Sequence, residues 1–487
     1  MAGVGFELKK LFKKKGFFAS VKAYGYSSLI CAGPMLLGVI LILGILMLVN
    51  HFDRSQFDRE LTVCMITYTL LASLLVTSFF SMAVTRYIAD MLFEEKRKSV
   101  ISSFFGSAGI MLFFGCTAYG IFLIFSGATL TEGLLCLLFF SELIVTWNAT
   151  SYLTAIKDYR GIMLSLAAAI GVSLLLAALF LYLGLPTTVG VLLSVTIGYG
   201  VMLPWHLVLL CRYFPQGDTS ALFFLHWVDR FLPLAFAGLL TKVGLMSHLV
   251  IMWFGPLQVQ VKGLFFGAPF HDVPALIAYM TTLITTVNFV VSVEVNFYPK
   301  YRSYFALFND RGTVGDILQA EKEMLGVMKS ELWYTSLKQL FTTALAISVG
   351  ELLLKFLPLG FNDLMFGYFR ILTIGYGLYA VANMIMLMLL YFTDYTGALE
   401  ASAAFALVSS VMTVVSLKFD PAYFGIGFVL GGIAFFLVGV IRLDYYTKRL
   451  RYFILAAQPI VSGEKNGFFT KAGRSLSRRL EGGTHEF

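Results

Sequence analysis

Charged residues are scarce in this chain, making up only 13% of its 487 residues. Soluble globular domains carry about 25% charged residues, so a soluble fold is disfavoured from composition alone. The net charge of +8 does not by itself indicate nucleic acid as a partner, because the placement of basic residues matters more than their number. We expect no nucleic acid partner.

Motifs that mark common enzyme classes are missing as well. The sequence contains no GxxxxGK[ST] phosphate loop, no HExxH and no GxSxG. Its 5 cysteines fall within or at the ends of apolar runs and form no CxxC, which favours packing residues over a disulfide framework or a metal site. We therefore expect a protein that is not an enzyme and needs no metal or cofactor.

Long apolar runs dominate what is present. Apolar residues make up 58% of the chain and the mean hydropathy is +0.82. About 20 helical residues cross the roughly 30 Å hydrocarbon core of a bilayer. The runs predict an all-α integral membrane protein with about twelve transmembrane helices. The expected spans cover residues 24–49, 61–85, 101–126, 131–156, 161–183, 187–211, 231–254, 273–294, 334–356, 366–392, 398–417 and 423–443.

Lysine and arginine are distributed unevenly between alternate connections. With the N-terminus inside, 28 of the 36 basic residues lie on the cytoplasmic side and 5 on the opposite side. The positive-inside rule then predicts cytoplasmic termini and an even number of spans. We expect two six-helix bundles, as in transporters built from parallel repeats. The expected parts are a basic interfacial segment 1–23, a bundle 24–212, a linker 213–230, a bundle 231–446 and a basic tail 447–487.

Two charges lie deep inside predicted spans, one in each half of the chain. Lys242 and Glu142 fall at similar depths, and a lysine near the bilayer centre costs about 2.5–3.5 kcal/mol on insertion scales. We expect both to face a central cavity and to pair when it is empty; the alternative is a structural role. Arg370 is a further candidate of the path, although at the outer end of a span it could simply snorkel.

Aromatic and amide side chains follow Glu142 along the same span. Trp147, Asn148 and Tyr152 would suit a carbohydrate path, because sugar rings offer apolar faces and hydroxyl edges; ordinary packing is the alternative. Arg86 and Asp90 are spaced i,i+4 and are expected to pair locally.

The cytoplasmic segments suggest contacts outside the membrane core. The basic and apolar residues of 6–22 suit a short helix on anionic membrane lipids, or an ordinary positive-inside flank. The inner loop 299–331 has apolar residues at helical spacing and would suit docking of a cytoplasmic partner.

Two motifs resemble a known family. The opening MAGVGFELKKL over residues 1–11, followed by Ala32-Gly33-Pro34, resembles the PelG family of exopolysaccharide export proteins. The segment Glu294-Val295-Asn296-Phe297-Tyr298, with Tyr301 and Tyr304 after it, resembles the acidic and aromatic stretch of that family. Glu294, Tyr298, Tyr301 and Arg302 are accordingly our candidates for partner docking.

The resemblance implies a member of the multidrug, oligosaccharidyl-lipid and polysaccharide exporter superfamily in the bacterial cytoplasmic membrane. It implies export of a hexosamine-rich exopolysaccharide of biofilms, supplied by a cytosolic PelF-like glycosyltransferase, with PelD- and PelE-like membrane proteins as further partners. Two other functions stay open: a flippase for lipid-linked oligosaccharide, and a membrane anchor that holds a polysaccharide synthase without transporting. The first would favour several cations for a pyrophosphate; the second predicts that cavity substitutions leave secretion unchanged.

Overall fold

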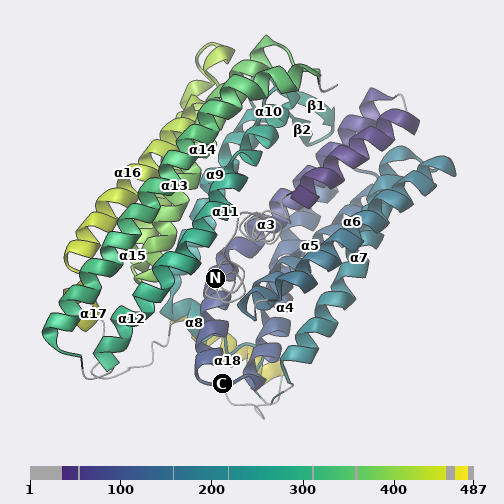
Figure 1. Cartoon of the computed structure of the whole chain (residues 1–487). Coiled ribbons are helices and arrows are strands. Elements are labelled where there is room, and N and C mark those ends of the chain that lie inside the picture. The colour runs from purple at the N-terminus through teal and green to yellow at the C-terminus, as the bar shows by residue number, and fades with distance from the viewer. Residues whose placement is uncertain are drawn as a thin grey trace, which may run out of the picture. The chain divides into compact units, whose positions relative to one another are not determined.

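The computed structural model describes residues 36–52, 55–156, 158–215, 217, 219–309, 312–356, 360–456 and 467–480, with the backbone alone at 294, 309, 356 and 480. Helices make up nearly all of this part of the chain (Figure 1). Within it, 11 helices are long and apolar enough to cross a membrane, and Leu36–Phe52 is a shorter apolar helix. The predicted all-α membrane fold is confirmed. The basic segment 1–23 and the opening motif lie outside the described residues.

Contacts divide the chain into two compact units. The N-terminal unit comprises residues 36–246, 252–268 and 467–480. In it α5 packs against α3, α4 and α7, and α6 packs against α7. Its helices are Leu36–Phe52, Gln56–Phe93 (α3), Lys98–Phe125 (α4), Leu130–Ala155 (α5), Tyr159–Tyr182 (α6), Thr187–Tyr213 (α7), Leu225–Arg230 (α8), Leu232–Met252 (α9, most of its length) and Phe468–Leu480 (α18).

The C-terminal unit comprises residues 247–251 of α9 and residues 269–456. Here α14 packs against α10, α13 and α16, and α15 packs against α16. Its elements are Pro269–Met280 (α10), Thr282–Ser292 (α11), the π-helical turn Val293–Phe297 (η1), Tyr298–Asn309 (α12), Val314–Phe356 (α13), Asp363–Tyr391 (α14), Tyr395–Ser416 (α15), the 3-10 turn Pro421–Tyr423 (η2), Ile426–Lys448 (α16) and Leu450–Ala456 (α17). The boundaries of these two units differ from those of the predicted bundles 24–212 and 231–446. The division into those bundles remains a prediction.

Side-chain caps explain where several helices begin. Thr129 and Glu132 form a reciprocal capping box at the start of α5, which satisfies backbone N–H groups that have no partner inside the helix. Asn362 caps α14 by accepting from the N–H of Met365 at 2.9 Å. Inside the N-terminal unit, Gly198 of α7 lets that helix approach α6, since a Cβ there would lie 2.5 Å from the carbonyl oxygen of Ala169.

The segment after α9 contains the two strands of the described chain. The connection 255–272 forms a two-stranded antiparallel hairpin, Val259–Lys262 (β1) and Phe265–Gly267 (β2). Lys262 anchors it to α5 through an ion pair with Glu132 at 2.6 Å. The rest of the described chain is helical apart from short turns and connections, so the hairpin leaves the all-α fold class unchanged.

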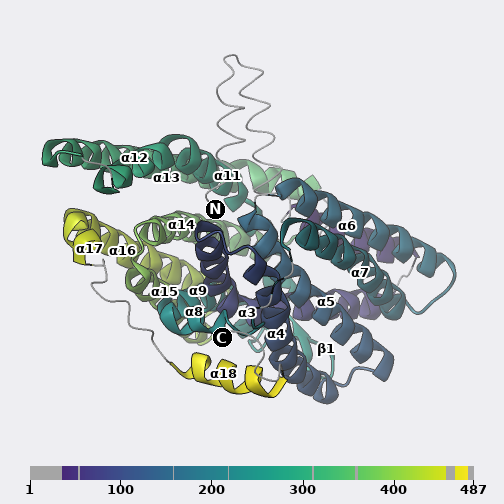
Figure 2. The same cartoon turned by 90° about the horizontal axis from the view of Figure 1, so that it is seen from below.

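The predicted span 273–294 is a broken helix and the predicted loop 299–331 is helical. The span consists of α10, a break at Thr281, α11 and η1, after which α12 continues. The loop forms α12 and the first part of α13, which lie side by side (Figure 2). At 43 residues α13 is about 65 Å long, so it extends far beyond a bilayer core of about 30 Å.

Candidate substrate pathway

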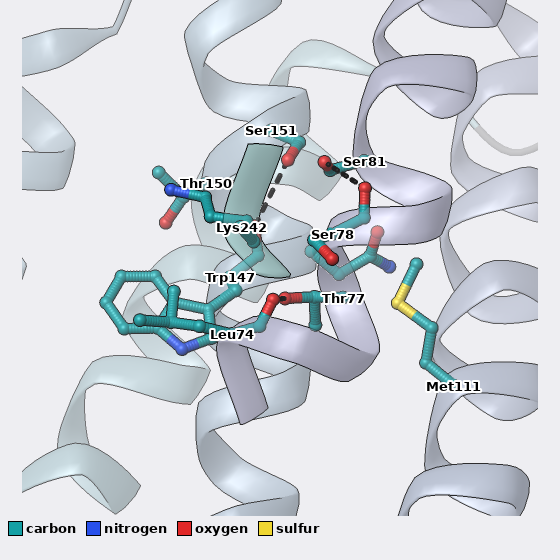
Figure 3. Close-up of a pocket in the computed structure, with 10 residues that line it drawn as sticks. Leu74, Thr77, Ser78, Ser81, Met111, Trp147, Thr150, Ser151 and Lys242 are labelled. Atoms are coloured by element: carbon teal, nitrogen blue, oxygen red, sulfur yellow. Dashed lines mark hydrogen bonds between the residues drawn. The ribbon is translucent and has the colours of Figure 1, made fainter. Parts of the chain in front are cut away.

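A cavity lies inside the N-terminal unit, at the predicted path residues (Figure 3). Its volume is about 210 Å³, which is below the range of about 300–1,000 Å³ typical of small-molecule sites. It offers room for part of a sugar chain and not for a whole oligosaccharide. The lining residues come from four helices: Leu74, Thr77, Ser78 and Ser81 of α3, Met111 of α4, Trp147, Asn148, Thr150 and Ser151 of α5, and Lys242 of α9.

The hydroxyl groups of this cavity are already oriented by their own helices. Thr77 donates to the carbonyl oxygen of Ser73 at 2.9 Å, Ser78 to that of Leu75 at 2.7 Å, and Thr150 to that of Thr146 at 2.8 Å. A hydroxyl that donates to backbone keeps its lone pairs available as acceptors. The wall therefore presents hydrogen-bond acceptors to a ligand rich in donors.

Trp147 and Asn148 are held in place by neighbouring helices. The indole N–H of Trp147 donates to Oγ of Ser73 at 3.1 Å. The amide of Asn148 donates to Oγ of Ser107 at 2.9 Å and to the carbonyl oxygen of Phe104 at 3.3 Å. Its Oδ1 is buried and has no hydrogen-bond partner among the described residues. Buried polar atoms are normally hydrogen-bonded, so this oxygen is an acceptor suited to a ligand or a water molecule.

Lys242 contributes the positive charge of the cavity. Its side chain is half-buried, and no carboxylate stands among the lining residues. It forms no ion pair within the described part of the chain. A lysine at this depth is normally found facing a partner or a wet cavity, and here it faces the cavity.

Glu142 lies apart from these residues. Successive residues turn by about 100° in an α-helix, so Glu142 and Trp147 point about 140° apart around α5. The Glu142 carboxylate faces α7, where a Cβ on Gly200 would lie 3.2 Å from its Oε1. The expected pairing with Lys242 is absent among the described residues, because similar depth does not imply the same face.

Tyr152 and Arg370 also lie away from the cavity lining. Tyr152 is fully buried, and its hydroxyl bonds to Ser103 at 3.0 Å and Ser107 at 3.3 Å. Arg370 belongs to the C-terminal unit, where its guanidinium pairs with Glu351. Tyr152 thus supports the helix that carries Asn148, whereas Arg370 is a half-exposed ion-pair partner.

The candidate docking residues surround η1. Tyr298 is partly buried and stacks on Tyr301, whose hydroxyl donates to the carbonyl oxygen of Tyr391 at 3.1 Å; Arg302 is exposed. The side chain of Glu294 lies outside the described part of the structure. π-helical turns inside α-helices are frequent at functional sites. Tyr301 fixes α12 against the end of α14, and Arg302 is the candidate that is free to meet a partner.

Sequence reasoning missed the hydroxyl residues of α3 and the continuation of the wall on α5. Thr77, Ser78 and Ser81 recur at helical spacing within an apolar span, as do Thr150 and Ser151 after Trp147. This spacing was the available signal, because polar residues that share a face of a membrane helix mark a buried or wet side.

Comparison with known families decides the identity of the chain. Residues 1–455 match the PelG family, described as "Putative exopolysaccharide Exporter (EPS-E)". The chain belongs to the PelG family. The match covers most of the sequence, and the resemblance seen in the opening residues is confirmed. No curated protein matches the chain.

Solved structures with a similar fold are transporters. A MOP superfamily transporter from Pyrococcus furiosus matches with a TM-score of 0.62 at 11% identity, over 87% of this chain and 96% of that chain. A variant of a Vibrio cholerae MATE transporter matches with a TM-score of 0.62 at 14% identity, over 92% and 98%. A eukaryotic MATE transporter matches with a TM-score of 0.53 at 13% identity, over 94% and 98%. This PelG protein therefore has the fold of MOP-superfamily transporters, and its family is one of exporters rather than enzymes.

Proposed function

We propose that this PelG protein moves a hexosamine-rich exopolysaccharide across the bacterial cytoplasmic membrane while a cytosolic glycosyltransferase supplies the chain. The family and fold make it a membrane transporter of the exopolysaccharide-exporter family. The proposal of a sugar substrate is supported by the cavity, which combines an indole, a buried amide oxygen, several hydroxyls and one ammonium group.

The chemistry of this wall suits a sugar chain. An aromatic side chain packs against the apolar C–H face of a sugar ring, and oriented acceptors bind its hydroxyl and acetamido N–H groups. Lys242 repels a chain of free amines and tolerates N-acetylated or acidic units. We therefore propose that the polymer passes as neutral or acidic hexosamine units.

The single cation separates this proposal from transport of a lipid-linked oligosaccharide. A pyrophosphate is recognised best by several cations or bidentate arginines. In the described part of the cavity wall Lys242 is the only basic residue. The composition of the wall thus favours a sugar polymer.

The helices α12 and α13 supply the surface that we propose for the glycosyltransferase. They carry the docking candidates Tyr298 and Arg302, and α13 extends beyond the length of a membrane span. With the orientation predicted from the basic residues, this surface faces the cytoplasm. PelD- and PelE-like proteins are proposed as membrane partners of the same assembly.

Secretion by cells that carry cavity variants tests the proposal. Lys242→Gln and Thr77→Val remove a charge and a hydroxyl from the cavity at nearly constant volume. We expect each to reduce secreted polymer at least tenfold without changing the amount of protein in the membrane. The matched control is Thr117→Val, which removes a hydroxyl that makes the same backbone bond on the exposed face of α4.

Normal secretion by both cavity variants would overturn the proposed path. If deletion of residues 312–330 alone abolished secretion, the protein would instead act as a membrane anchor for the synthase. Glu142→Gln shows whether the path also runs along the face of α5 that meets α7.

A further inference from the structure

A cluster of buried titratable groups lies in the C-terminal unit and plays no part in the cavity. His248 of α9 and His271 of α10 are both fully buried, with ring centroids 5.2 Å apart. Asp272 follows His271, and its Oδ1 lies 3.6 Å from Nδ1 of His271. Tyr376 of α14 bonds through its hydroxyl to Nε2 of His248 at 3.1 Å.

The histidine rings are unusually poor in hydrogen bonds. Nδ1 of His248 and both ring nitrogens of His271 are buried without a hydrogen-bond partner among the described residues. Buried side-chain nitrogens are normally satisfied, so three such atoms in one cluster call for an explanation. Each neutral imidazole has one nitrogen that can accept a proton, and here the two rings meet edge to face with centroids 5.2 Å apart.

We propose that His248 and His271 form a proton-binding site, with Asp272 as the counter-charge, that powers or gates export. A proton from solution adds to the lone pair of one imidazole nitrogen, and the resulting imidazolium is balanced by the Asp272 carboxylate. No covalent bond breaks, and the proton leaves by the reverse step. This proposal goes beyond the exported polymer and concerns how transport is driven.

The surroundings define which groups respond to the added charge. Besides Asp272, α10 contributes Tyr279, whose ring lies 5.3 Å from that of Tyr376. From α14, Tyr368 faces His271 with ring centroids 5.7 Å apart, and its hydroxyl donates to the carbonyl oxygen of Pro421 at 2.6 Å, next to Asp420. The neighbour from α16 is an apolar ring, Phe428, 4.2 Å from His248.

These neighbours give the two protonation states different preferred positions. A charge on the pair would meet the apolar ring of Phe428 on the α16 side and the carboxylate of Asp272, 3.6 Å from His271, on the α10 side. Protonation therefore changes the balance of contacts that α9 and α10 make with α14 and α16. A ligand or proton shifts a conformational equilibrium only through such a difference between states.

The helix α9 carries both His248 and the cavity residue Lys242. His248 follows Lys242 by six residues, about 9 Å along the helix axis. With the predicted orientation, the cluster lies toward the outer end of α9 and receives protons from the outer solution.

Nuclear magnetic resonance of the full-length protein in lipid bilayers tests proton binding directly. The chain has 6 histidines, so ¹⁵N-histidine spectra are simple, and His248→Gln and His271→Gln assign the pair. We expect one ring of the pair to change from neutral to imidazolium when the pH is lowered. In Asp272→Asn the midpoint of this change should move to lower pH, since the counter-charge is lost.

The matched control is His206→Gln in the N-terminal unit. His206 is equally buried and bonds to a hydroxyl, Oγ of Ser165 at 2.8 Å, and no second histidine contacts its ring among the described residues. This variant should leave the titration of the pair unchanged. Both rings staying neutral over the whole range, or an unchanged midpoint in Asp272→Asn, would overturn the proposal.

Secretion measured against external pH separates this inference from the proposed substrate. We expect secretion to lose its pH dependence in His271→Gln and to keep it in His206→Gln. If the pH dependence persisted in His271→Gln, the histidine pair would neither drive nor gate export. If His248 and His271 bind a proton but Lys242→Gln secretes normally, the cavity is not the export path, whereas the proposed proton site is retained.

Discussion

The C-terminal helix α18 is held in the N-terminal unit by a cap that comes from a residue 240 positions earlier. Asp229 accepts from the backbone N–H of Phe469 at 3.2 Å, and from the N–H and hydroxyl of Thr470, each at 2.6 Å. A second contact joins the hydroxyls of Ser220 and Ser477 at 2.9 Å. An isolated helix of 13 residues is marginal in water, so α18 depends on these contacts.

Replacing Asp229 by alanine should release the start of α18. Loss of an aspartate cap costs about 0.5–2 kcal/mol, and hydrogen bonds to a charged group are worth about 1.5–3 kcal/mol each. Because Asp229 is half-exposed, we take about 2 kcal/mol for the whole cap. This corresponds to about 30-fold faster opening of the helix.

Hydrogen–deuterium exchange of the peptide covering residues 468–480 measures this opening. We expect about 30-fold faster exchange in Asp229→Ala and a smaller increase in Asp229→Asn, which keeps one acceptor oxygen. The matched control is Asp420→Ala, which removes the cap of η2 in the other unit, where Asp420 accepts from Ala422 at 2.9 Å. Unchanged exchange in Asp229→Ala would show that the cap does not hold α18.

Two further predictions concern the packing of the N-terminal unit. Gly238→Val should lower the melting temperature in detergent, because a Cβ at this position would lie 2.8 Å from the carbonyl oxygen of Ser78. Gly109→Ala is the control and should leave the melting temperature unchanged, because no atom beyond its own helix backbone lies within 4 Å of a Cβ at that position. Equal melting temperatures of the two variants would contradict the close approach of α9 to α3. In a double-mutant cycle, alanine substitutions of Lys262 and Glu132 should show a coupling of about 1–2 kcal/mol in the free energy of unfolding, since the pair is largely buried. Additive effects of the two substitutions would contradict the role of the pair in anchoring the hairpin.

Much of the fold could be predicted because each membrane span is recognisable from the composition of its own residues. A helix that crosses a bilayer must be apolar for about 20 residues, so the spans are visible as runs in the sequence. The pair of Arg86 and Asp90, predicted from i,i+4 spacing, is present at 3.0 Å. The helical spacing seen in residues 299–331 agrees with α12 and the first part of α13, whereas the short hairpin after α9 was not predicted.

The residue types of the candidate site could be predicted from the sequence, but which of them lie together could be predicted only in part. Lys242 stood out because a charge in an apolar run is costly, and it lines the cavity with Trp147 and Asn148. Glu142 lies at a similar depth but on another face of α5, which meets α7. Depth follows from counting residues along one helix, whereas the direction of a side chain toward its neighbours depends on how helices pack.

The sequence by itself determined that this is a helical membrane protein of the PelG family, because hydropathy and the opening motif are properties of contiguous residues. Only the tertiary structure decided which polar groups share a space. It brought hydroxyls of α3 to the lysine of α9, and it placed His248 against His271 and Asp272. Such groupings join residues far apart in the chain, and they arise from helix packing that no single segment encodes.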